Sequence, residues 1–107
     1  MKYLNMEGFS ETSEKSIYRA YRVNIAQMIM ESYDSGHFST TNKMARMFEI
    51  TGEEASDFIL EKYTSGEYDV EDLIKSVSEC EAVFRVPYYR LSEDLKKIYE
   101  EHESKYI

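Results

Sequence analysis

The sequence has little of what covalent or metal-based stabilisation requires. Its 107 residues include one cysteine, one proline and four glycines, and no tryptophan. One cysteine cannot form an internal disulfide, so we expect the fold to depend on a hydrophobic core. No secretion signal opens the chain, and no apolar run approaches the ~20 residues that cross a bilayer. These absences predict one soluble cytoplasmic domain over 1–107, with 1–12 as a flexible N-terminal segment and with no membrane contact.

Residue patterns typical of enzymes are also missing. The glycines are isolated from one another, which excludes a glycine-rich phosphate loop. His37 and His102 are far apart in the sequence, and Cys80 has no second thiol, so we expect no metal site. Cys80 lies between Glu79 and Glu81, whose negative charge disfavours a thiolate. The sequence therefore predicts a protein that is not an enzyme and has no cofactor.

Basic residues are few, 13 Lys and Arg against 21 Asp and Glu, which gives a formal net charge of −8. The excess lies in one stretch, because 48–84 contains eleven acids and two bases, whereas the two flanking stretches are close to neutral. Concentrated charge attracts partners of the opposite sign and accelerates their association. The alternative is that these acids stabilise helix ends and keep the protein soluble.

Apolar residues recur with helical spacing in five segments, at about 13–33, 39–48, 52–64, 69–77 and 92–102. Ser39 and Asp69 are suitable N-caps, and Thr51 or Gly52 begins the helix between them. Gly36 can adopt the left-handed conformation after the first helix. The stretch 83–89 is rich in aromatic and β-branched residues, which makes it the one candidate for a short extended segment. The predicted fold class is all-α, a compact bundle of about five helices.

Two motifs within this pattern carry a resemblance. The residues at 33–39 read Tyr-Asp-Ser-Gly-His-Phe-Ser, and those at 44–55 read Met-Ala-Arg-Met-Phe-Glu-Ile-Thr-Gly-Glu-Glu-Ala. Together they resemble the helix-turn-helix segment of small bacterial DNA-binding proteins, antitoxins among them, over residues 28–59. In that pattern the residues that pack the two helices around the turn correspond to Ala45, Ile50, Ala55 and Phe58. The resemblance implies a tri-helical core and, as function, a transcription regulator or antitoxin.

The helix that would enter the DNA groove departs from this pattern. Glu49 stands at the position of the turn glycine. The helix after it has four acids and one base, which are Glu53, Glu54, Asp57, Glu61 and Lys62. DNA affinity depends largely on Lys and Arg that neutralise phosphates. Direct DNA binding is therefore the less favoured function, and it would need other cations, in a dimer: Arg19, Arg22, Lys43 and Arg46.

Our leading hypothesis is a small acidic protein that inhibits or regulates a nucleic-acid-binding protein by occupying its basic surface. In overall character such a protein resembles the phage-encoded inhibitors of CRISPR and restriction nucleases, some of which mimic DNA. The predicted partner-binding residues are Glu53, Glu54, Asp57, Glu61, Glu67, Asp69 and Asp72.

A second set of candidate contacts mixes arginine and tyrosine, a combination that is enriched at interfaces and can stack on single-stranded nucleic acid. This set is Arg19, Arg22, Arg85, Tyr88, Tyr89 and Arg90. A third alternative is an assembly module whose Tyr-rich last helix pairs with another subunit, as in a homodimer.

Overall fold

Five α-helices and one short 3₁₀ helix follow one another in this computed structural model, which describes the backbone of residues 11–106 and the side chains of residues 17–103. The elements are α1 (Glu11–Asp34), α2 (Phe38–Phe48), α3 (Gly52–Thr64), α4 (Val70–Phe84), η1 (Tyr88–Arg90) and α5 (Glu93–Tyr106). The described residues contain no β-strand. The predicted all-α bundle of about five helices is therefore confirmed. Of the segment expected to be flexible, residues 1–10 lie outside the described part, and α1 begins at Glu11.

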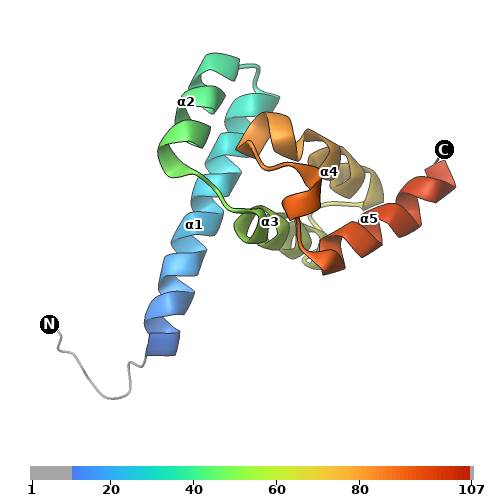
Figure 1. Ribbon diagram of the computed structural model, residues 1–107, viewed down its shortest axis with the longest axis horizontal. Helices are drawn as coiled ribbons and strands as arrows, with labels where there is room; N and C mark the ends of the chain where they lie inside the picture. The colour runs from blue at the N-terminus through green and yellow to red at the C-terminus, as the bar shows by residue number, and fades with distance from the viewer. Residues whose placement is uncertain (1–10, 107) are drawn as a thin grey trace, which may run out of the picture.

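Helix α1 is the longest element, with 24 residues, and both α2 and α3 pack against it. Helix α4 contacts α1, α2, α3 and α5, while α2 and α3 contact each other much less than they contact α1. In Figure 1 the first half of α1, drawn in blue, projects beyond the other helices. Its large apolar side chains are exposed, and Ile17 is 70% and Tyr18 61% accessible.

The core lies between α1, α3, α4 and the start of α5. Its largest fully buried side chains include Phe58, Phe84, Ile29, Leu73 and Leu95. The rings of Phe58 and Phe84 meet edge to face, with their centroids 6.0 Å apart, which ties α3 to α4. Apolar burial of this kind is the main source of stability in a domain without disulfides.

The predicted N-cap Asp69 is confirmed, and of the two residues that could begin the third helix, Thr51 is the cap and Gly52 the first helical residue. The Thr51 hydroxyl accepts a hydrogen bond from the Glu54 amide, and the Glu54 carboxylate accepts one from the Thr51 amide, which is a capping box. Asp69 forms the same reciprocal pair with Asp72 at the start of α4. The prediction for Ser39 is wrong: α2 begins at Phe38, and its N-cap position is His37, two residues before Ser39. The chain turns at His37, whose carbonyl oxygen accepts hydrogen bonds from both the amide and the hydroxyl of Thr41.

The expected extended segment at 83–89 is also wrong. Val83 and Phe84 complete α4 and are fully buried in the core. Arg85 then ends the helix in the left-handed conformation, with φ +63°, and Pro87 precedes the 3₁₀ turn of η1. These aromatic and β-branched residues are apolar because they face the core, and the described chain offers no neighbouring strand with which they could pair.

Candidate interaction surfaces

Two acids of α3 face α1. Both carboxylate oxygens of Glu54 accept hydrogen bonds from the guanidinium of Arg22, each at 2.9 Å, and the two side chains are 19% and 13% exposed. One turn further along α3, Asp57 forms an ion pair with Arg19. The sequence suggests Glu54, Asp57 and Glu61 as contacts to a partner, but the first two of these acids join helices within the protein.

Arg22 holds three elements together. Its Nη2 also donates to the carbonyl oxygens of Phe48 at 2.8 Å and Glu49 at 3.1 Å, where α2 ends. These carbonyls are the groups that a helix leaves without a partner at its C-terminus. The hydrogen bonds with Arg22 hold the pKa of Glu54 below its ordinary value, and those with Glu54 raise the pKa of Arg22. Arg22 is therefore a structural residue, although the sequence suggests it as a contact to DNA or to a partner.

Five exposed acids gather where α3 ends and α4 begins. We call this surface the acidic junction, and it consists of Glu61, Glu67, Asp69, Glu71 and Asp72, all exposed. Lys62 pairs with Glu67 at 2.9 Å, and the Lys75 ammonium nearby is 3.9 Å from Asp34 on α1. Asp69 and Asp72 have a second role, because they cap α4. Glu53, also exposed, lies at the other end of α3, about 12 Å of helix away from Glu61.

Helix α3 is the helix that a helix-turn-helix protein would place against DNA. Glu49, at the position of the pattern's glycine, has φ +45°, the left-handed conformation that glycine favours. The rest of α3 is enclosed. Of its 13 residues only Glu53, Glu61 and Thr64 are exposed, and it contacts α1, α4 and α5. At its first residue, a Cβ on Gly52 would lie 2.1 Å from the carbonyl oxygen of Arg90, so η1 covers the start of the helix.

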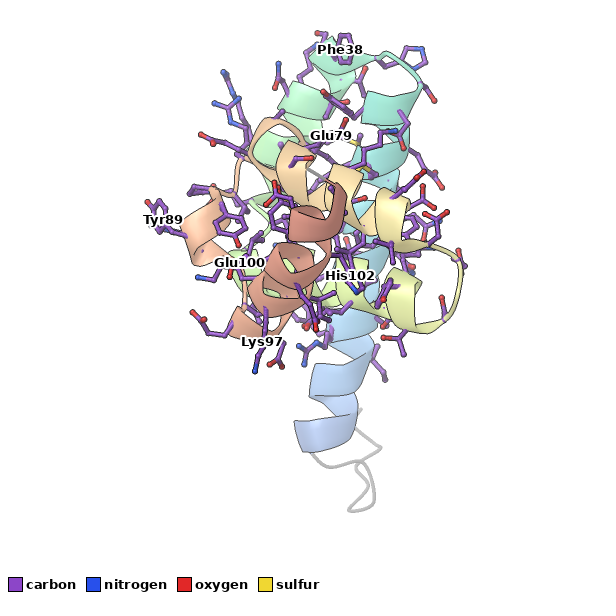
Figure 2. All side chains as sticks on the ribbon, turned by 90° about the vertical axis from the view of Figure 1, so that its right-hand side faces the viewer. Phe38, Glu79, Tyr89, Lys97, Glu100 and His102 are labelled. Atoms are coloured by element: carbon purple, nitrogen blue, oxygen red, sulfur yellow. The ribbon has the colours of Figure 1, made fainter. Side chains whose placement is uncertain are left out.

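Four cations lie on the other side of the molecule, and we call them the basic cluster: Lys43, Arg46, Arg85 and Arg90. All four are exposed, and the structure shows no ion pair for any of them among the described residues. Figure 2 shows the loop between α3 and α4, in pale yellow, on its right edge and η1 with Tyr89 on its left edge. The acidic junction and the basic cluster are thus on opposite edges.

The two tyrosines of η1 have different surroundings. Tyr89 is 73% exposed. Tyr88 turns towards α5, where its hydroxyl donates to Glu100 at 2.6 Å and its ring lies 5.6 Å from that of Tyr99. Burial and the bond to Glu100 raise the pKa of Tyr88. Tyr88 therefore anchors η1 to α5, and Tyr89 is the more exposed of the two.

Groups with chemical reactivity are few. Cys80 is 1% exposed, and burial raises the pKa of its thiol to about 12, so it does not act as a nucleophile at neutral pH. Glu79 beside it has one carboxyl oxygen that is buried without a hydrogen-bond partner among the described residues, and burial raises its pKa. No three His, Cys, Asp or Glu residues in the described part of the chain are grouped as metal ligands.

Comparison with known proteins gives no match for this chain. No protein family, no curated protein and no solved structure matches the chain. None of the described helices has the length and apolar character needed to cross a membrane. The functional argument therefore depends on the surfaces described above.

Proposed function

We propose that the protein is a small interaction module that binds the basic surface of a nucleic-acid-handling protein through its acidic junction, and so inhibits or regulates that protein. The observation that carries the proposal is the density of exposed carboxylates at the junction, five between positions 61 and 72 against one cation, Lys62. An array of this kind attracts Lys and Arg on a partner and repels other acids.

The structure narrows the residues that the sequence suggests for this contact. Glu54 and Asp57 are withdrawn from the proposal because they pair with Arg22 and Arg19. Asp69 and Asp72 contribute charge, but their carboxylates also cap α4. Glu61 and Glu71 are the exposed acids of the junction that have neither an ion pair within the described residues nor a capping role, which makes them the residues to test.

One structural observation favours the competing function, a helix-turn-helix regulator, and another disfavours it. The left-handed turn at Glu49 favours it. The enclosure of α3 disfavours it, because a recognition helix needs a free face to enter the major groove. Arg19 and Arg22, two of the four cations suggested for DNA contact, are also paired with acids. We therefore keep the acidic junction as the basis of the proposed function.

The test is affinity capture from cells of the source organism with three immobilised forms: the wild type, the double variant Glu61→Lys/Glu71→Lys, and the control Glu31→Lys/Asp94→Lys. The control changes the net charge by the same amount as the junction variant. Like that variant, it replaces one acid inside a helix and one acid in the first turn of a helix. We expect the wild type and the control to retain a nucleic-acid-binding protein that added duplex DNA releases. The junction variant should retain much less of it. Equal retention by the junction variant would contradict the proposal.

A further inference from the structure

We propose that the basic cluster binds the phosphate backbone of single-stranded nucleic acid, with Tyr89 stacking on a base. This inference does not depend on the proposed function, which concerns the opposite edge of the molecule. Ten Lys and Arg side chains are described, and five of them form ion pairs. Four of the other five belong to the basic cluster, so the unpaired positive charge of this acidic protein is concentrated in one place.

The fold brings these four cations together from two distant parts of the chain. Lys43 and Arg46 are one turn apart on α2, and Arg46 lines a surface hollow of about 430 Å³ together with Arg85. Arg85 also lines a second hollow, of about 490 Å³, with Arg90 and Tyr89. The cations therefore follow one another from α2 across two adjoining hollows to η1, an arrangement that can follow the phosphates of an extended strand.

The surroundings of the second hollow also favour an anion. Thr51 and Gly52, at the N-terminus of α3, are part of its lining, so the positive end of this helix dipole adds to the charge of the arginines. Glu49 lines both hollows and opposes this charge, which leaves a net charge of +2 on the lining of the two hollows, from Arg46, Arg85, Arg90 and Glu49. Lys43, one turn from Arg46 on α2, adds one further positive charge. The acidic junction affects the cluster little at physiological salt, because the Debye length is about 8 Å and the molecule measures 24 Å along its shortest axis.

Tyr89 favours a single strand over a duplex. Its side chain is 73% exposed and belongs to the lining of the hollow that Arg85 and Arg90 also line. Bases in a single strand are free to stack on such a ring, whereas bases in a duplex stack on one another. A duplex would meet the same cations without this stacking contact.

Fluorescence anisotropy with a labelled 12-nucleotide oligothymidylate tests the proposal directly, with a duplex of equal length as the comparison. If four cations each neutralise a phosphate, affinity should fall by about fiftyfold between 50 and 200 mM salt. Arg85→Glu should weaken binding at least tenfold, and Tyr89→Ala about tenfold through lost stacking. Glu49→Gln should strengthen binding several-fold, because it removes the one acid that lines both hollows.

The matched control is Lys97→Glu. Lys97 is an exposed lysine of α5 with no ion pair among the described residues, it lines neither hollow, and it is labelled at the lower end of α5 in Figure 2. This substitution should change affinity less than twofold, although its change in net charge equals that of Arg85→Glu. Circular dichroism melts of the variants, together with a second reversal at Arg46, separate lost binding from lost folding. Absence of oligothymidylate binding, equal effects of Arg85→Glu and Lys97→Glu, tighter binding of the duplex, or tighter binding of a polyglutamate peptide would each overturn the proposal.

Discussion

Arginine and glutamate occur both at the interface between α1 and α3 and at the two opposite edges of the molecule, but their roles differ. At the interface, Arg22 and Glu54 are paired, mostly buried and hydrogen-bonded to the end of α2 and to the N-cap of α3. At the edges, Arg85 and Glu61 are exposed, and neither takes part in an ion pair within the described chain. The difference teaches that residue type does not separate structural charges from charges free to bind a partner. The packing of α1 on α3 decides which charges are paired within the protein and which stay exposed.

The largest effect is expected at the interface. Arg22→Ala removes four hydrogen bonds and leaves Glu54 and the last carbonyls of α2 without their partner. Breaking a largely buried charge pair in this way should cost about 2–4 kcal/mol of unfolding free energy. Urea denaturation measures the loss. Arg46→Ala is the matched control, because its exposed side chain forms no ion pair, and it should change stability by less than about 0.5 kcal/mol.

A smaller loss of stability is expected when the pH is lowered. The pKa of Glu54 is lowered by its hydrogen bonds to Arg22, so its contribution is fully present above the unfolded-state value of about 4.3 and is lost as the pH falls through the lower folded-state value. Urea denaturation between pH 7 and pH 3 should show this loss. Glu54→Gln should be less stable than the wild type at pH 7 and should approach it as the pH falls. A constant difference across the range would show that the Glu54 charge is not involved.

The smallest effect has the opposite sign. Glu79 is a partly buried acid of α4, and one of its carboxyl oxygens is buried without a hydrogen-bond partner among the described residues. Burial raises the pKa of Glu79. Its ionised form therefore costs stability above the folded-state pKa, and this cost disappears at low pH. Glu79→Gln should stabilise the protein at pH 7 by less than about 1 kcal/mol, and the gain should vanish near pH 3. Destabilisation at pH 7 would contradict this interpretation.

The sequence predicts the local features of the fold because their causes lie within a few residues of each other. Asp69 is identified as a cap, and Thr51 is one of two candidates for the start of its helix, since the partner of each is three positions away. The left-handed conformation of Gly36, with φ +83°, is likewise confirmed. The extended segment predicted at 83–89 is wrong because a buried helix end and a strand contain the same apolar residue types.

The ion pairs between α1 and α3 could not be predicted in this way. Arg19 and Asp57 are 38 positions apart, and Arg22 and Glu54 are 32 apart, so their contact depends on how two helices pack. The basic cluster has the same origin, because Arg46 on α2 and Arg85 after α4 meet only in the folded chain. The sequence places Arg19, Arg22, Arg85 and Arg90 in one candidate set, and the packing of the helices divides it into two structural and two free arginines.

The division between structural and free acids can be measured without a partner by reversing one charge of each kind. Urea denaturation of Glu54→Lys and Glu61→Lys at pH 7 compares two substitutions with the same charge change, seven residues apart on one helix. Glu54→Lys should lose more than about 3 kcal/mol, because it places a cation beside Arg22 and breaks the capping box. Glu61→Lys should stay within about 0.5 kcal/mol of the wild type. Equal losses in the two variants would contradict the division on which both proposed surfaces depend.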